Sequence, residues 1–230
     1  DLETVKKSAE NSDTAIISLG RSSGEWFDIP TVKGSYFLTD IEEELLKNVT
    51  ASFEKTVLIL NYSGVMDITF AERYNIDAIV YTSMGGEETG NSVADILVGN
   101  VSPSGKLTDS WCKLEDYITN DRITELSIPY NEGIFVGYRY FDTFGIDPVY
   151  PFGFGLSYTD FDINVKGVSV EKTRVNIDVE VKNVGKFKGK EVVQVYLSEP
   201  EGKLPKAYQQ LATFKKTREL GVGETEKLNL

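Results

Sequence analysis

Residues 39–61 read TDIEEELLKNVTASFEKTVLILN and predict a helix that is followed directly by a buried strand. Thr39 and Glu42 have the spacing of a capping box, in which the side chain of each accepts a hydrogen bond from the backbone amide of the other. Apolar residues then recur at helical spacing, at Ile41, Leu45, Leu46, Val49 and Phe53. The apolar run at 56–61 is typical of a strand that is covered on both faces. The stretch therefore predicts one helix–strand unit of an α/β protein.

The same alternation continues on both sides of this unit. Short apolar runs at 14–19 and 76–81 predict two more strands, and residues 3–11 and 89–99 predict two more helices, the second closed by Gly99. Strands that alternate with helices form largely parallel sheets with helices over their faces. We therefore predict an α/β sandwich over residues 1–112.

The pattern changes in the second half of the chain. Residues 127–154 are dense in aromatic side chains, which predicts an extended, largely buried connecting arm over 113–157. Beyond Tyr158 the sequence alternates with a period of two, most clearly at 175–181 and 193–197, which predicts an all-β sandwich over 158–230. Only about five strands fit, whereas a complete sandwich of this kind has about seven, so we expect this domain to be incomplete.

Composition excludes several functional classes. The net charge of −12 repels phosphate backbones, so nucleic acid is not expected as a partner. No apolar run approaches the ~20 residues that a membrane span needs. The chain has no histidine and a single cysteine, Cys112, which exclude a Ser-His-Asp or Cys-His catalytic set and an internal disulfide. Catalysis must then rest on carboxylates, lysine, tyrosine or hydroxyls. The compartment and the formation of a homo-oligomer are left open.

The loop after the strand at 14–19 carries the most chemistry. Ligands bind beyond the carboxyl ends of parallel strands, and this loop places Arg21, Glu25, Trp26 and Phe27 there. A carboxyl group beside two aromatic rings is partly desolvated, which raises its pKa toward that of a general acid. Glu25 is therefore the candidate acid, and Arg21 and Trp26 are candidate substrate contacts. The alternative is an ordinary solvated loop.

Six segments together resemble glycoside hydrolase family 3, in particular its β-glucosidases. They are SGE at 23–25, GGEETG at 85–90, NVSPSGKL at 100–107, EGIFVGYRYFD at 132–142, PFGFGLSY at 151–158 and GKEVVQVY at 189–196. The first five resemble the accessory α/β domain of the family, and the last resembles its fibronectin-type-III-like module. The chain departs from the common pattern at Trp26, Phe27, Ile29 and Glu87.

The resemblance implies a retaining β-glycosidase that hydrolyses terminal β-linked glucose or a similar sugar, from a β-glucoside or an oligosaccharide, without a metal or an organic cofactor. It implies that Glu25 is the acid/base residue. It also implies that the nucleophilic aspartate comes from a (β/α)8 barrel of the same enzyme, to which nothing in this chain corresponds. We therefore expect the chain alone to be inactive.

Three alternatives remain open. Glu88 is a second candidate acid, although its place at a predicted helix start favours its ionised form. The chain could also be a non-catalytic carbohydrate-binding or docking module. A nucleotide-binding α/β protein is a third interpretation, but the glycines at 99, 105, 153 and 155 match neither phosphate-binding fingerprint.

Overall fold

A computed structural model describes residues 2–21, 29–118, 127, 129–200 and 202–230. The chain forms two compact units, 1–93 with 111–117 and 94–110 with 118–230. Each unit is described by itself below. The predicted domain boundaries at residues 112 and 157 stay predictions.

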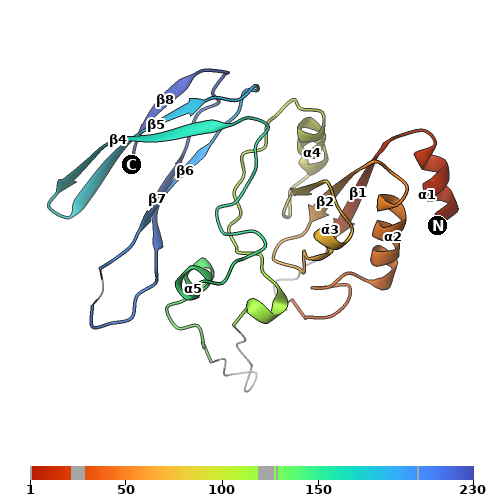
Figure 1. Ribbon diagram of the computed structural model, residues 1–230, viewed down its shortest axis with the longest axis horizontal. Coiled ribbons are helices and arrows are strands. Elements are labelled where there is room, and N and C mark those ends of the chain that lie inside the picture. The colour runs from red at the N-terminus through yellow and green to blue at the C-terminus, as the bar shows by residue number, and fades with distance from the viewer. Residues whose placement is uncertain (1, 22–28, 119–126, 128, 201) are drawn as a thin grey trace. The chain divides into compact units, whose positions relative to one another are not determined.

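The first unit is built on a three-stranded parallel sheet, as the sequence predicts (Figure 1). Its strands lie in the order β1-β2-β3, and each is preceded by a helical segment. Its elements are α1 (Leu2–Ala9), β1 (Thr14–Gly20), α2 (Asp40–Thr50), β2 (Lys55–Asn61), α3 (Phe70–Arg73), β3 (Ala78–Tyr81) and the short 3-10 turn η1 (Leu114–Asp116). The helix α4 (Thr89–Leu97) follows β3, and Gly99 has the positive φ of +78° that suits a glycine after a helix end.

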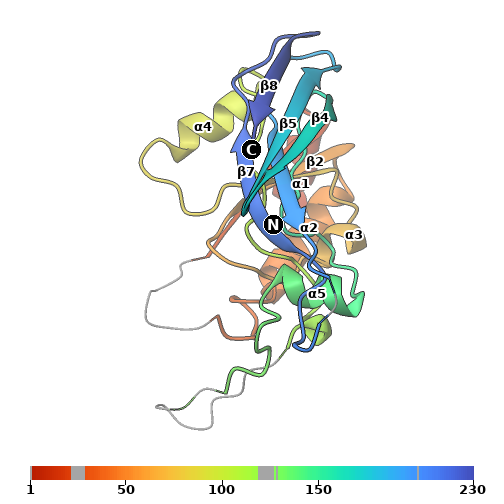
Figure 2. The ribbon, with the colours of Figure 1, turned by 90° about the vertical axis from the view of Figure 1, so that its left-hand side faces the viewer.

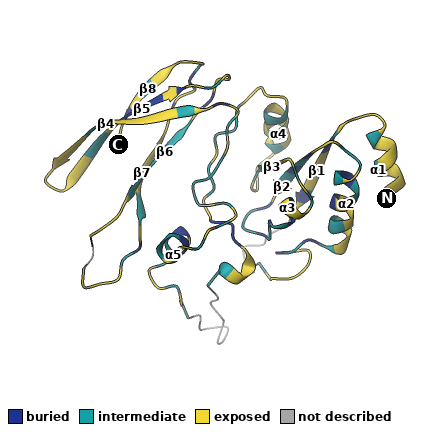
Figure 3. Ribbon diagram, in the orientation of Figure 1, coloured by how far each residue is buried: buried dark blue, intermediate teal, exposed yellow. Residues whose placement is uncertain are grey.

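The core of this unit lies on one face of the sheet (Figure 3). Ile17 of β1 is paired in register with Leu58 of β2, and Leu19 with Leu60, and all four side chains are buried. Helix α2 packs on β2 and buries Leu46 and Val49. Burial of one large aliphatic side chain contributes about 1.5–3 kcal/mol, so these residues hold the strand order together.

The predicted capping box at the start of α2 is confirmed. Thr39 Oγ1 accepts a hydrogen bond from the Glu42 amide at 3.2 Å, and Glu42 Oε2 accepts one from the Thr39 amide at 2.8 Å. The predicted apolar face of the helix is wrong at its first turn, because Ile41 is 80% exposed. The buried stripe begins only with Leu46, since α2 meets the sheet through its second half.

The described residues of the second unit form five strands, as expected, in antiparallel sheets of the order β4-β5-β8 (Figure 2) and β6-β7. The strands are β4 (Phe161–Glu171), β5 (Arg174–Asn183), β6 (Val192–Leu197), β7 (Gln210–Lys216) and β8 (Thr225–Asn229). The two sheets share a core of Val179, Val181, Val193, Leu220 and Leu228. The arrangement agrees with a fibronectin-type-III-like sandwich.

Part of the aromatic segment folds as a helix, α5 (Tyr138–Phe144), which corrects the prediction of an extended arm. Gly137 and Gly145 stand at its two ends with positive φ, conformations that glycine adopts without a steric penalty. Tyr138 and Phe141 are buried, but Tyr130 is 77% exposed, so the segment is buried only in part. None of the described helices is both long and apolar enough to cross a membrane.

Candidate active site

The candidate site lies at the carboxyl ends of β1, β2 and β3. Because the three strands are parallel, these ends lie along one edge of the sheet, where such folds bind ligands. Arg21 follows β1, Tyr62 follows β2 and Thr82 follows β3. Backbone hydrogen bonds continue the ladder past the strands, from the Arg21 amide to the Asn61 carbonyl at 3.1 Å and from the Thr82 amide to the Leu60 carbonyl at 3.0 Å.

Two of the three predicted site residues, Glu25 and Trp26, lie in the segment 22–28 and so outside the described residues. Their roles stay predictions. The described chain runs to Arg21 on one side of this segment and resumes at Ile29 on the other. The described part of the site therefore consists of residues that precede and follow this segment in the chain.

Arg21 is held by the protein on several sides. Its Nη1 and Nη2 atoms donate to Glu42 Oε1 and Oε2 at 2.6 and 2.7 Å, which makes a bidentate ion pair. Nε donates to the Ser35 carbonyl at 3.3 Å, and Nη1 also donates to the Gly20 carbonyl at 3.0 Å. The side chains of Arg21 and Glu42 are only 8% and 18% exposed. The predicted contact of Arg21 with a substrate stays untested, and its described contacts are all within the protein.

The carboxylate of Glu42 accepts hydrogen bonds from two residues, Arg21 and Thr39. Oε2 accepts from Arg21 and also from the amide and hydroxyl of Thr39, at 2.8 and 3.0 Å. Burial by itself raises the pKa of Glu42, but the hydrogen bonds from Arg21 and Thr39 outweigh it, so the pKa lies below its usual value. Glu42 is therefore ionised at neutral pH, and the ion pair with Arg21 is complete.

Two tyrosines lie near the same edge. Tyr62 is buried, and its hydroxyl has no hydrogen-bond partner among the described residues. Burial raises the pKa of Tyr62, and the positive charge of Arg21 offsets part of this effect. The hydroxyl of Tyr81 accepts a long hydrogen bond from the Gly64 amide at 3.4 Å, and its ring packs edge-on against Trp111 with centroids 5.3 Å apart. The edge thus combines one buried cation with two phenols.

The second candidate acid is placed differently. Glu88 precedes helix α4 directly, is exposed, and accepts a hydrogen bond from Asn91 Nδ2 at 2.6 Å. The carboxylate of Glu88 is therefore a solvent-exposed group that is hydrogen-bonded to the first turn of α4.

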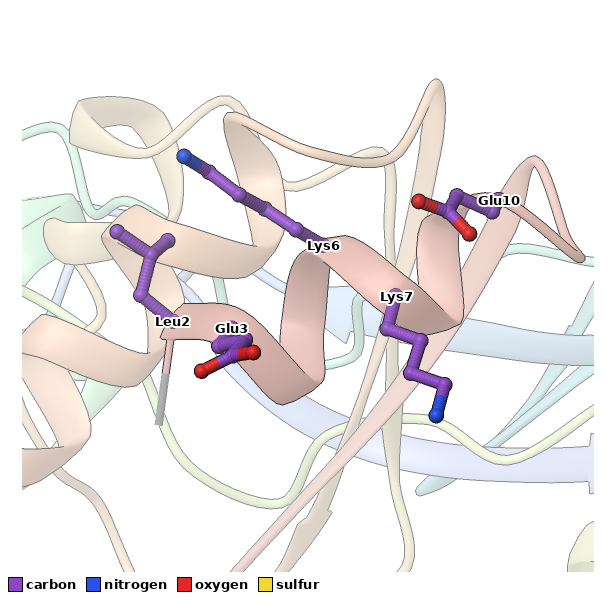
Figure 4. A pocket seen from close by; sticks show the side chains of 5 residues that line it. All are labelled: Leu2, Glu3, Lys6, Lys7 and Glu10. Atoms are coloured by element: carbon purple, nitrogen blue, oxygen red, sulfur yellow. The ribbon is translucent and has the colours of Figure 1, made fainter.

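A second feature of the first unit is a hollow on its surface. An open hollow runs along α1, lined by Leu2, Glu3, Lys6, Lys7 and Glu10 (Figure 4). All five side chains are exposed, and Figure 4 shows Lys6 and Lys7 extending in different directions from the helix. Within the part of the chain that the structure describes, no group of three or more cysteine and carboxylate side chains could hold a metal ion. The hollow is a solvated helix surface.

Sequence reasoning missed two features of this edge. Glu42 was recognised as a capping residue but not as the partner of Arg21, because no local pattern links residues 21 positions apart. Tyr62 lies one residue beyond the strand predicted at 56–61 and is not among the predicted site residues. The pairing of Glu42 with Arg21 has no signal in the sequence. Tyr62 has one, its place directly after a buried strand, because a parallel sheet carries functional side chains at the carboxyl ends of its strands.

Comparisons with known proteins show which family the chain resembles. Residues 1–158 match the Glycosyl hydrolase family 3 C-terminal domain, and residues 191–230 match the Fibronectin type III-like domain. A β-glucosidase of Ruminococcus albus is 44% identical over 100% of this chain and 24% of its own length.

Solved structures give the same result. A β-glucosidase of Paenibacillus barengoltzii superposes with a TM-score of 0.95 at 39% identity, over 100% of this chain and 26% of that chain. β-Glucosidase 3B of Thermotoga neapolitana, in complex with α-D-glucose, superposes with a TM-score of 0.93 at 36% identity, over 100% of this chain and 33% of that chain. The chain thus spans 24% to 33% of the length of these three relatives.

Proposed function

Because this chain belongs to glycoside hydrolase family 3, we propose that it works as one part of a retaining β-glucosidase and supplies the acid/base residue, Glu25. The observation that carries the proposal is the match of residues 1–158 to the C-terminal domain of the family, joined to likeness with β-glucosidases over the whole chain. The place of Ser23-Gly24-Glu25 in the sequence supports it, because these residues come soon after the end of β1 at Gly20, and parallel sheets bind ligands beyond the carboxyl ends of their strands.

The proposed reaction has two steps. An aspartate from a (β/α)8 barrel of the same enzyme attacks the anomeric carbon, and Glu25 donates its proton to the glycosidic oxygen as that bond breaks. The resulting Glu25 carboxylate then takes a proton from the water that attacks the glycosyl–aspartate bond. Retention requires the two carboxyl groups to lie about 5–5.5 Å apart, so the barrel must meet this chain at the segment that holds Glu25.

Terminal β-linked glucose is the proposed sugar, from a β-glucoside or a short oligosaccharide. This substrate is inferred from the three relatives reported above, which are all β-glucosidases. No step needs a metal or an organic cofactor, because two carboxyl groups supply the nucleophile and the proton.

The test is Glu25→Gln in the full-length enzyme. Glutamine keeps the shape and polarity but has no transferable proton, so kcat/KM on a disaccharide should fall by about 10²–10⁴-fold. The loss of kcat/KM on a dinitrophenyl glucoside should be far smaller, since this leaving group departs without protonation.

Glu88→Gln is the matched control, because Glu88 is the other candidate acid. We expect Glu88→Gln to change kcat/KM on the disaccharide and kcat/KM on the dinitrophenyl glucoside by the same small factor. The proposal fails if Glu88→Gln shows the leaving-group dependence while Glu25→Gln does not.

A further inference from the structure

We infer that Arg21 is a positioning residue for the acid/base group, and that its ion pair with Glu42 fixes the point at which the chain leaves the sheet toward Glu25. This inference rests on the proposed role of Glu25. It assigns to Arg21 and Glu42 a function in the reaction without direct contact between either residue and the sugar.

The first support is the way in which the donors of Arg21 are used. The guanidinium carries five N–H groups, and it donates four hydrogen bonds to Glu42, Ser35 and Gly20. At most one N–H remains for another partner. Only 8% of the Arg21 side chain is exposed, so its guanidinium is held by hydrogen bonds within the protein.

The second support is what these bonds join. Arg21 and Ser35 stand on opposite sides of the connection between β1 and α2, and the hydrogen bond from Arg21 Nε to the Ser35 carbonyl ties its two sides together. Glu42 in turn is held at the start of α2 by the amide and hydroxyl of Thr39. These hydrogen bonds fix three parts of the chain relative to one another: the end of β1, Ser35 in the connection and the start of α2.

The third support is energetic. A buried ion pair contributes little net stability compared with apolar side chains of the same size, because the two charges must lose their water. A bidentate arginine–carboxylate pair does fix direction, since two parallel hydrogen bonds allow one orientation. Directional control matters next to a group that must meet a reacting oxygen, because an error of about 1 Å can lower the rate by about 10²-fold.

The experiment compares Arg21→Lys and Glu42→Gln in the full-length enzyme. Lysine keeps the charge but loses the bidentate geometry, and glutamine keeps the shape but loses the charge. For both variants we expect kcat/KM on a disaccharide to fall by about 10–100-fold. The fall on a dinitrophenyl glucoside should be only a few-fold, since that substrate does not need the proton.

The matched control is Glu191→Gln, which removes the charge from a pair of similar burial. Lys106 Nζ lies 2.9 Å from Glu191 Oε1, and their side chains are 17% and 16% exposed. Loss of this pair should alter stability and affect both substrates equally. An equal loss on both substrates for Arg21→Lys and Glu42→Gln would show a merely structural role and overturn the inference.

A double variant separates this inference from the proposal on which it rests. If Arg21 acts through Glu25, Arg21→Lys should add no further loss on the disaccharide in a Glu25→Gln background. Additive losses overturn the inference while the role of Glu25 stands. If Glu25→Gln itself shows no leaving-group dependence, the proposed function fails first, and the inference fails with it.

Discussion

The phenol oxygen of Tyr138 accepts a hydrogen bond from the backbone amide of Leu211 at 2.7 Å. This bond joins α5 to β7 within the second unit. Two more bonds lie beside it, from Gln209 Nε2 to Asp142 at 2.9 Å and from the Tyr208 amide to Thr143 Oγ1 at 2.9 Å. The helix in the aromatic segment is thus attached to the start of a strand through three of its own side chains.

We predict that Tyr138→Phe exposes the Leu211 amide to exchange. The part-buried amide loses its acceptor, which costs about 1–3 kcal/mol of local stability. Hydrogen exchange of Leu211 should therefore accelerate by about 5–150-fold, as measured by NMR. Tyr140→Phe is the control, because the Tyr140 hydroxyl has no hydrogen-bond partner among the residues described. Unchanged protection of Leu211 in Tyr138→Phe would contradict this account of α5.

How much of this architecture could be predicted depended on whether its signals are local. The capping box of Thr39 and Glu42 and the strand at 56–61 were predicted correctly, because each rests on neighbouring residues. Helix α5 was missed, because its aromatic residues lie on both its buried and its exposed side, with Tyr138 and Phe141 buried but Phe144 56% exposed. Gly137 and Gly145 bracket it at positive φ, and their spacing was the available sign of a helix between two glycines.

The strand at 14–19 could be recognised from the sequence, and Arg21 follows it as expected, whereas the site roles of Arg21, Glu25 and Trp26 stay predictions. The partner of Arg21, Glu42, comes from another element, and such pairs are set by tertiary packing that no spacing rule gives. Ile41 shows the same limit, since its helical spacing predicted burial but α2 meets the sheet only farther along.

The second prediction concerns pH. The pKa of Glu42 is lower in the folded chain than in the unfolded one, so the unfolded state binds its proton first as the pH falls. Glu42 therefore stabilises the fold above its ordinary pKa of about 4.5, and this contribution is lost as the pH falls through the lowered value. The difference in unfolding free energy between the wild-type chain and Glu42→Gln should be constant near neutral pH and narrow below about pH 4.5. Urea denaturation at several pH values measures it, and a difference that widens in acid would contradict the account.

The third prediction concerns the hydroxyl of Tyr62, which is buried and has no hydrogen-bond partner among the residues that the structure describes. A buried hydroxyl that makes no hydrogen bond lowers stability, so Tyr62→Phe should leave the unfolding free energy unchanged or raise it. Tyr117→Phe is the contrasting variant, because the Tyr117 hydroxyl accepts a hydrogen bond from the Cys112 amide at 2.9 Å. Its removal should lower the unfolding free energy by about 1–3 kcal/mol. A larger loss in Tyr62→Phe than in Tyr117→Phe would show that Tyr62 has a partner after all.

The fourth prediction is that these 230 residues alone do not turn over an aryl β-glucoside. One carboxyl group cannot be both nucleophile and acid in the same step, and the proposed nucleophile belongs to the barrel. The purified chain would be shown to be folded by circular dichroism and then assayed with an activated substrate. Sustained turnover that is abolished by Glu25→Gln would contradict the division of the active site between this chain and the barrel.

The central claim is that Glu25 is the acid/base of a retaining enzyme, and the product formed in the presence of azide tests it most directly. In full-length Glu25→Ala, a dinitrophenyl glucoside still forms the glycosyl–enzyme intermediate, but water attacks it slowly because no base is present. Azide needs no base, and the truncation to alanine leaves room for it beside the intermediate. The account predicts that azide restores turnover and that NMR identifies the product as β-glucosyl azide, with retained configuration. Failure of azide to restore turnover, or a glucosyl azide of inverted configuration, would contradict it.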